Sequence, residues 1–109
     1  MTRTCDSGLR LAELELGRGR HVATPWGPYA LFLVDGEVLC VQAFCPHMDG
    51  PLFEGTVSQG TIVCPWHLWR YDLRSGKRTD PAGLLDRRCL SRLAVRAGPA
   101  GTLLLERRD

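Results

Sequence analysis

The sequence lacks long hydrophobic runs, and it lacks charged blocks of either sign. No uninterrupted apolar stretch approaches the roughly 20 residues that span a bilayer, and residues 1–10 contain no apolar segment typical of a signal peptide. These absences predict a cytoplasmic protein with no membrane partner. The 109 residues carry a net charge of +2 with acids and bases interspersed, which predicts that nucleic acid is not a partner either.

The sequence also lacks helical periodicity. No segment shows an apolar stripe over three helical turns, and seven prolines and twelve glycines would interrupt most helices. Internal repeats, low-complexity tracts and linkers are missing as well. The length therefore predicts one domain that spans residues 1–109.

Apolar residues instead alternate in short runs that turn signals separate. Residues 29–44 contain two such runs joined at Asp35-Gly36, a dipeptide that tolerates positive φ and suits a tight hairpin turn. Short strands with frequent turns favour an all-β sandwich or small barrel. Further strands are expected at residues 9–16, 60–64, 89–95 and 102–106, with the last two forming a hairpin.

The five cysteines are an odd number, which argues against a complete disulfide framework. In a reducing compartment such cysteines are metal ligands or packed thiols. Cys40 and Cys89 lie in alternating apolar stretches, so we expect both to be packed free thiols. Cys5 lies in an N-terminal segment that we expect to be mobile, and we assign it no role.

Two loops between the expected strands carry the residues best suited to bind a metal. Residues 44–55 contain Cys45-Pro46-His47, and residues 64–76 contain Cys64-Pro65-Trp66-His67. The combined pattern is C-x-H, sixteen residues, then C-x-x-H. Either half alone is weak evidence, but both together predict that Cys45, His47, Cys64 and His67 are metal ligands.

The pattern resembles the Rieske family of [2Fe-2S] proteins, in which two histidines replace two of the four cysteine ligands on one iron. The resemblance is strongest in the two loops and extends over roughly residues 20–95. It implies a Rieske-like antiparallel β-sandwich with two cluster-binding loops at one tip. It also implies that Cys45 and Cys64 bind one iron, and that His47 and His67 bind the other.

This ligand set implies a function in electron transfer. Two thiolates neutralise the formal +2 charge of two ferric irons and two sulfides, so an added electron meets a less negative centre than in a four-cysteine cluster. Both irons are fully ligated by the protein, which leaves no open position for a substrate. The resemblance therefore implies a one-electron carrier rather than an enzyme.

The residues around the ligands predict a potential toward the low end of the Rieske range of roughly −150 to +300 mV. High-potential members carry a disulfide where this chain has Gly50 and Trp66, and a serine where it has Trp69. Their tyrosine is retained as Tyr71, which the family pattern would aim at the sulfur of Cys45. Such a hydrogen bond raises the potential modestly, although Tyr71 as a simple packing residue is an open alternative.

The remaining loop residues are candidates for shielding or docking. Trp66 and Trp69 either shield the cluster from water or only pack the loops, and Pro81 resembles the third loop that covers the cluster in this family. Because the net charge is near zero, we expect partner choice to depend on shape and apolar contact. The docking candidates, which Trp66 would join, are Pro46, Met48, Pro65 and Leu68.

Several functions remain open. The leading one is a Rieske ferredoxin that passes electrons from a reductase, expected to be flavin-dependent, to a terminal oxygenase or related oxidoreductase. A second is a permanent small subunit of a larger oxidoreductase such as nitrite reductase. From another class comes a zinc-stapled interaction domain, although familiar Cys2His2 zinc sites group like ligands together. An oxygenase by itself would need a catalytic domain that this sequence does not contain.

Overall fold

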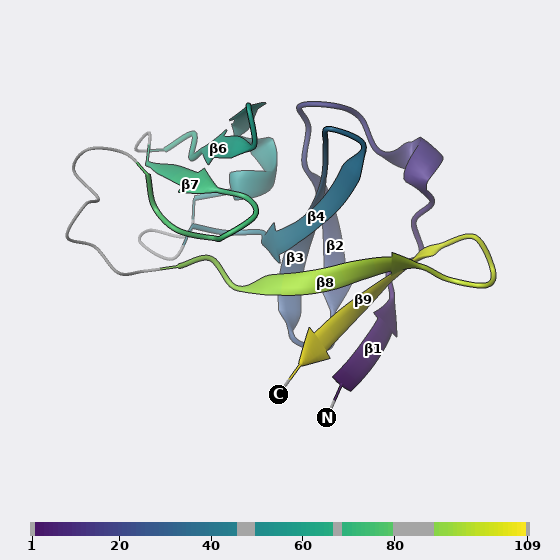
Figure 1. The fold of residues 1–109 in the computed structure, drawn as a ribbon. Coiled ribbons are helices and arrows are strands. Elements are labelled where there is room, and N and C mark those ends of the chain that lie inside the picture. Colours follow the sequence, from purple (N-terminus) through teal and green to yellow (C-terminus); the bar gives the residue numbers. More distant parts are fainter. Residues whose placement is uncertain (1, 46–49, 67–68, 80–88, 109) are drawn as a thin grey trace.

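The computed structural model describes residues 2–45, 50–66, 69–79 and 89–108, which contain two antiparallel sheets. The larger sheet has the strand order β1-β9-β8-β4-β3-β2, and the smaller one has the order β5-β6-β7. Figure 1 shows the small sheet at one end of the molecule and the two chain ends at another. The predicted all-β fold is confirmed.

The large sheet comprises β1 (Thr2–Asp6), β2 (Arg20–Thr24), β3 (Gly27–Val34), β4 (Glu37–Gln42), β8 (Arg92–Ala97) and β9 (Leu103–Arg108). The small sheet comprises β5 (Thr56–Ser58), β6 (Thr61–Val63) and β7 (Arg70–Asp72).

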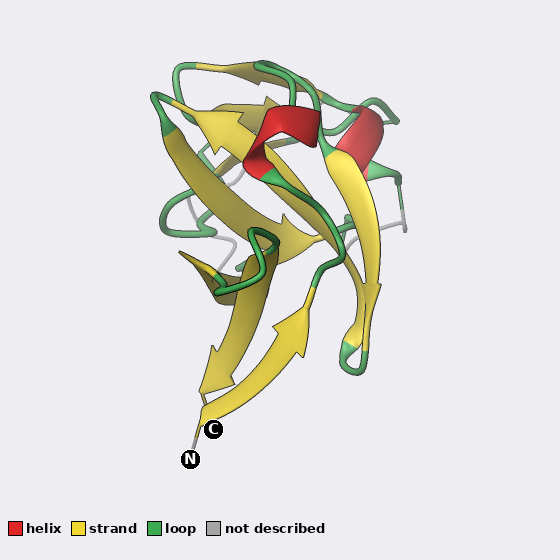
Figure 2. Cartoon of the chain, turned by 90° about the vertical axis from the view of Figure 1, so that its right-hand side faces the viewer, coloured by secondary structure: helices red, strands yellow, loops and turns green. Residues whose placement is uncertain are grey.

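Within the described residues, the helical structure consists of two 3-10 turns. These are η1 (Leu11–Glu13) and η2 (Leu52–Glu54), and Figure 2 shows both far from the paired chain ends. No helix in this described part is long and apolar enough to cross a membrane.

The hairpin predicted at residues 29–44 is confirmed. Strands β3 and β4 pair with Val34 opposite Glu37, which leaves Asp35 and Gly36 as the two turn residues. Their φ angles are 51° and 77°, as a tight turn of the primed type requires. The second predicted hairpin, β8 with β9, is also present.

The strand predicted at residues 9–16 is wrong. The chain forms η1 there, and Leu9 and Leu14 are buried while Leu11 and Leu16 are 51% and 72% exposed. A strand would bury every second residue, whereas here the buried leucines are five positions apart. The segment lacks β-branched residues, and among the described residues its β-bridge to the sheet is the isolated one between Leu16 and Leu33.

The N-terminal segment is a strand rather than the mobile end that was expected. Strand β1 pairs with β9 from Thr2 opposite Arg108 to Asp6 opposite Leu104, and it includes Cys5. Cys89 also differs from expectation, because β8 begins only at Arg92 and leaves Cys89 exposed. Cys40 is a buried free thiol as predicted.

Strand β3 is buried on both faces and separates two hydrophobic cores. Alternate residues Ala30, Phe32 and Val34 belong to one core, which extends to the small sheet. Tyr29 and Leu31 belong to the other core, which β8, β9 and the segment around η1 complete. The first core includes Cys45, Cys64 and Tyr71, so the packing of the small sheet onto β3 and β4 positions the predicted metal site.

The second core buries the thiol of Cys40, which lowers its reactivity. Burial, with a smaller contribution from the neighbouring Cys5 thiol, raises the pKa of Cys40 from 9.0 to about 12. The Cys40 thiol therefore stays protonated in the folded chain at a pH where it ionises in the unfolded chain. The free energy of unfolding falls accordingly as the pH rises from 9.0 to about 12.

We expect iodoacetamide to modify Cys40 at least about 100-fold more slowly than Cys5 or Cys89 at pH 8. Peptide mass spectrometry measures this, and equal rates for all three thiols would contradict the burial of Cys40.

Candidate metal centre

Two strands deliver the two predicted cysteine ligands to the same core. Cys45 lies three residues after the end of β4, next to Phe44, which forms an isolated β-bridge with Pro51. Cys64 directly follows β6. Neither cysteine is part of a disulfide, and neither has exposed surface. The sequence placed these cysteines in separate loops, and the structure brings both into the core beneath the small sheet.

Each cysteine is held by a backbone hydrogen bond that closes its own loop. The N–H of Cys45 donates to the carbonyl of Gly50 at 2.7 Å, and the N–H of Cys64 donates to the carbonyl of Trp69 at 2.8 Å. In both loops the bond joins the cysteine to the residue five positions later. The same hydrogen-bond pattern therefore joins the two ends of each ligand loop.

Gly50 leaves the space that the thiol of Cys64 needs. A Cβ atom on Gly50 would lie 2.8 Å from Cys64 Sγ, well inside van der Waals contact. The same atom would lie 3.3 Å from Cβ of Trp66, so Gly50 and Trp66 face one another closely. The family resemblance implies a disulfide between the matching positions in high-potential members, and the Cβ separation of 3.3 Å here is slightly shorter than the roughly 3.5–4.5 Å of such a bond. In this chain, Gly50 leaves room for the thiol of Cys64 instead.

Tyr71 contacts the other thiol. It lies on β7, has no exposed surface, and its hydroxyl is 3.4 Å from Cys45 Sγ. A thiolate has no proton, so the tyrosine O–H would donate to the sulfur if Cys45 held a metal. This is the contact that the family resemblance implies.

Trp69 and Trp66 differ in their surroundings. Trp69 is partly buried and packs against the core that contains the thiols, whereas Trp66 is 63% exposed. The guanidinium carbon of Arg78 lies 3.2 Å from the centre of a Trp69 ring, in a cation–π contact that the sequence did not predict. Trp69 thus lies at the edge of the site, while Trp66 and the exposed Pro65 face solvent.

The other predicted site residues lie outside the described residues. These are Pro46, His47, Met48, His67, Leu68 and Pro81. Among the residues that the structure does describe, no group of three or more histidine, cysteine or acidic side chains is placed to hold a metal. Of the four predicted ligands, the structure describes the two cysteines. The third histidine of the chain, His21, is exposed, and its ring centre lies 5.1 Å from that of Phe53.

The described residues fit an iron–sulfur centre. Thiolates are soft ligands that select iron–sulfur clusters or zinc, and both thiols here are withdrawn from water. The hydroxyl of Tyr71 beside Cys45 can donate a hydrogen bond to a thiolate, which is the form of cysteine that binds a metal.

Comparison with known proteins gives one consistent family. The Rieske [2Fe-2S] domain matches residues 10–83. Human Apoptosis-inducing factor 3 is 36% identical over 72 residues, which are 66% of this chain and 12% of that protein. The chain therefore spans only a small part of the length of this curated relative.

Solved structures share the fold over almost the whole chain. Sphingomonas yanoikuyae B1 ferredoxin has a TM-score of 0.83 at 20% identity, covering 97% of this chain and 100% of its own. A chain in the complex of reduced oxygenase and oxidized ferredoxin in carbazole 1,9a-dioxygenase has a TM-score of 0.80 at 19% identity, covering 94% and 91%. A protein described as the small subunit of an NADH-dependent nitrite reductase from Mycobacterium tuberculosis has a TM-score of 0.76 at 22% identity, covering 100% and 96%.

Proposed function

The chain belongs to the Rieske [2Fe-2S] domain family, and from this premise we propose that it is a one-electron carrier between a reductase and a terminal oxygenase or related oxidoreductase. Membership in the family implies one [2Fe-2S] cluster in the domain. The observation that carries the proposal is the pair of fully buried thiols, one of them contacted by Tyr71, in a fold that matches a ferredoxin along both chains.

The proposal assigns a separate task to each part of the site. Cys45 and Cys64 would hold one iron, and His47 and His67 would hold the other, as the family pattern implies. The cluster supplies reversible one-electron chemistry when bound. The chain's own residues exclude water from the thiols, direct the Tyr71 hydroxyl at Cys45, and keep the backbone of each cysteine fixed. No residue among these would bind a substrate, so we assign the chain no catalytic role.

We also propose that the chain is a single domain. The family match ends at residue 83, but β8 and β9 complete the large sheet, which supports one domain over residues 1–109. Pro81 remains a candidate for a covering loop. The cytoplasmic location and the flavin-dependent reductase stay predictions.

The oxygenase partner is favoured because the same fold occurs in a complex of oxygenase and ferredoxin. A second candidate, a permanent small subunit of a larger oxidoreductase, is supported by the full-length likeness to the nitrite reductase subunit. The two differ in their behaviour on purification. A detachable carrier purifies alone with its cluster, whereas a permanent subunit co-purifies with its partner.

The direct test is the anaerobically purified protein. We expect two irons and two sulfides per chain, visible absorption, and after dithionite reduction a rhombic paramagnetic signal with low average g. Iron, sulfide and zinc analysis accompanies the spectra. A colourless protein that holds one zinc would refute the electron carrier and leave the zinc-stapled interaction domain.

Tyr71 provides a quantitative prediction. A hydrogen bond to a thiolate strengthens as electron density on sulfur grows, so the Tyr71 hydroxyl favours the reduced state by about 1 kcal/mol, or roughly 40 mV for one electron. We expect Tyr71→Phe to lower the reduction potential by that amount in a redox titration followed by visible absorption. The matched control is Tyr29→Phe, because the Tyr29 hydroxyl bonds Ser91 Oγ at 2.7 Å in the other core. An unchanged potential in Tyr71→Phe would make that residue a packing aromatic.

A further inference from the structure

Arg78 lies on the inner face of the hairpin that follows the second cysteine loop. The N–H of Thr79 donates to the carbonyl of Arg70 at 2.8 Å, and an isolated β-bridge places Arg78 opposite Tyr71. Directly opposed residues of an antiparallel pair point to the same side. Arg78 therefore shares the side of the hairpin on which Tyr71 points into the core that contains both predicted cysteine ligands.

The turn of this hairpin sets the register that places Arg78 inside. The carboxylate of Asp72 accepts two backbone N–H groups of the turn, and the carbonyl of Asp72 accepts the N–H of Gly76 at 2.7 Å. The φ of Gly76 is 77°, a conformation that favours glycine. A slip of the register by one residue would exchange the two faces and turn Lys77 inward instead of Arg78. The backbone therefore determines which of these two neighbouring cations faces the core.

Trp69 holds the guanidinium of Arg78 in place. The guanidinium carbon lies 3.2 Å from the centre of a Trp69 ring, which is the geometry of a close cation–π contact. Trp69 is partly buried against the core that contains both cysteines, and its carbonyl accepts the N–H of Cys64 at 2.8 Å. A single aromatic residue thus connects the cation to the backbone of the second predicted cysteine ligand.

The charge of Arg78 is partly withdrawn from water. The side chain of Arg78 is partly buried, whereas that of Lys77, the preceding residue, is exposed. Successive side chains of an extended chain point to opposite faces, which explains the difference. Water and salt screen a partly buried charge much less than an exposed one. Positions 77 and 78 therefore place the same unit of charge in two different environments.

We propose that Arg78, held on Trp69, raises the reduction potential of the cluster. This inference rests on the proposed electron-carrier function. Reduction adds one negative charge to the centre, and a positive charge on the adjacent face of the hairpin stabilises the reduced state more than the oxidised one. Tyr71 would act on one sulfur through a hydrogen bond, while Arg78 acts on the whole centre through its charge.

The effect does not require that Arg78 lack other partners. Electrostatic contributions add, so a neutral replacement removes one unit of positive charge from this place, whatever else the side chain contacts. The effect does require that the charge be held near the core, because a cation that moves freely into solvent is screened. The contact with Trp69 is therefore an essential part of the proposal.

The test is a redox titration of the cluster-loaded protein, followed by visible absorption. Arg78→Gln is expected to lower the equilibrium constant for reduction about threefold, which corresponds to about 30 mV for one electron. Arg78→Met is a second neutral variant and should give the same shift. Arg78→Lys keeps the charge and should lower the constant by less than about 1.5-fold.

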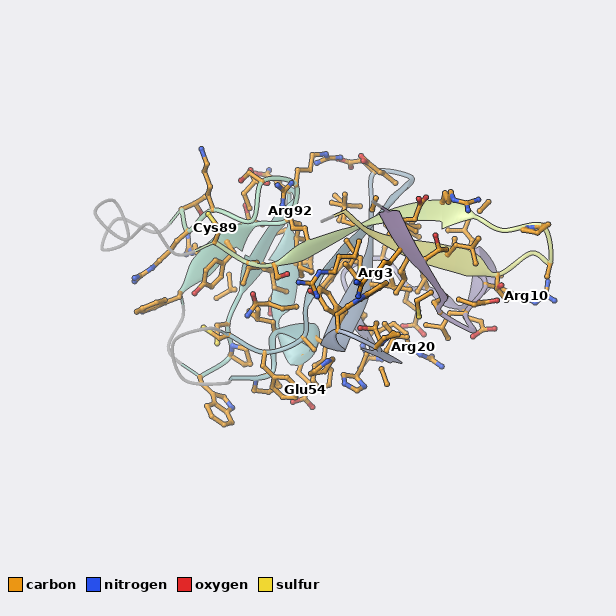
Figure 3. All side chains as sticks on the ribbon, turned by 90° about the horizontal axis from the view of Figure 1, so that it is seen from below. Arg3, Arg10, Arg20, Glu54, Cys89 and Arg92 are labelled. Carbon is orange, nitrogen blue, oxygen red and sulfur yellow. The ribbon has the colours of Figure 1, made fainter. Side chains whose placement is uncertain are left out.

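Two control variants remove the same charge elsewhere. Lys77→Gln does so on the exposed side of the same hairpin, and Arg10→Gln does so at a distant exposed position. Figure 3 shows Arg10 at the far end of the molecule from Cys89, whose backbone bridges Lys77. Both controls are expected to change the equilibrium constant by less than about 1.5-fold, because water and salt screen exposed charges.

A second readout uses the metal-free protein and does not depend on the cluster. Replacing Trp26 and Trp66 with phenylalanine leaves Trp69 as the only tryptophan of the chain. A stacked guanidinium covers one face of the indole, so Arg78→Gln in this background is expected to raise the acrylamide quenching constant about twofold. Lys77→Gln in the same background should leave the quenching constant unchanged.

The possible outcomes separate this proposal from the carrier function. Equal shifts in Arg78→Gln and Lys77→Gln, at full cluster content, would overturn the role of Arg78 but not the carrier. Equal shifts in Arg78→Lys and Arg78→Gln would also overturn it, since packing rather than charge would then set the potential. Unchanged quenching in Arg78→Gln would overturn the contact with Trp69 on which the proposal depends. A wild-type protein without the cluster signal would instead refute the carrier.

Discussion

Replacing Cys45 or Cys64 with serine is expected to abolish cluster loading. A serine hydroxyl is a hard ligand that stays protonated near neutral pH, whereas a thiolate is the soft ligand that iron–sulfur centres require. Both thiols are completely buried, so no other side chain from solvent can take their place without opening the core. We expect iron and sulfide to fall below about a tenth of the wild-type content in either variant, measured together with visible absorption.

The control for this experiment is Cys40→Ala. Cys40 is likewise a buried free thiol, but it belongs to the core on the other face of β3. Its replacement removes a small apolar group, which is expected to cost about 1 kcal/mol of stability while the cluster content stays at the wild-type level. Full cluster content in Cys64→Ser, or equal loss in Cys40→Ala, would contradict the assignment of the ligands.

The second large effect is expected at Gly55, which joins η2 to β5. A Cβ atom on Gly55 would lie 2.3 Å from the carbonyl oxygen of Val63 and 3.1 Å from that of Leu52. Both are backbone atoms, so the clash can be relieved only by moving β6 away from the segment that leads from Cys45. We expect Gly55→Ala to lower the free energy of unfolding by at least about 3 kcal/mol, measured by denaturant titration.

Gly36 provides the matched glycine. A Cβ atom there would meet nothing within 4 Å, but its φ of 77° disfavours any side chain. Gly36→Ala should therefore cost only the backbone strain, roughly 1–2 kcal/mol. If both variants lost the same stability, close packing between η2 and β6 would not be the reason for a glycine at position 55.

The sequence predicted those parts of the fold that are encoded locally. The Asp35-Gly36 turn is an example, because positive φ at two successive positions restricts which residues can occupy them. Strand β1 could not be found in this way, since its partner β9 lies at the other end of the chain and neither strand contains a signal for the pairing. The strand predicted at residues 9–16 is wrong for a related reason, because apolar alternation alone does not distinguish a strand from an irregular segment that buries some of its leucines against a sheet.

The site shows the same division. The specific spacing predicted the cysteines and histidines as ligands, and a matching family position predicted Tyr71 beside Cys45. The structure brings the two cysteines and Tyr71 into one core, while the ligand role of the cysteines and histidines stays a prediction. A glycine is needed at position 50 because a Cβ atom there would lie 2.8 Å from Sγ of Cys64, which is fourteen residues away in the sequence. No local sequence pattern predicts such a contact. The stacking of Arg78 on Trp69 likewise depends on the backbone bridge between Tyr71 and Arg78, which follows from the turn at residues 73–76.

The two hydrogen bonds that close the cysteine loops have a consequence for assembly. The bonds at Cys45 and Cys64 join main-chain atoms only, so they can form as the chain folds, whether or not the thiols hold a metal. Ordering a residue costs about 1–2 kcal/mol of conformational entropy, and here that cost belongs to folding rather than to metal capture. The apoprotein should therefore act as a prepared receptor for iron and sulfide, with the amides of Cys45 and Cys64 protected from hydrogen exchange before the cluster arrives.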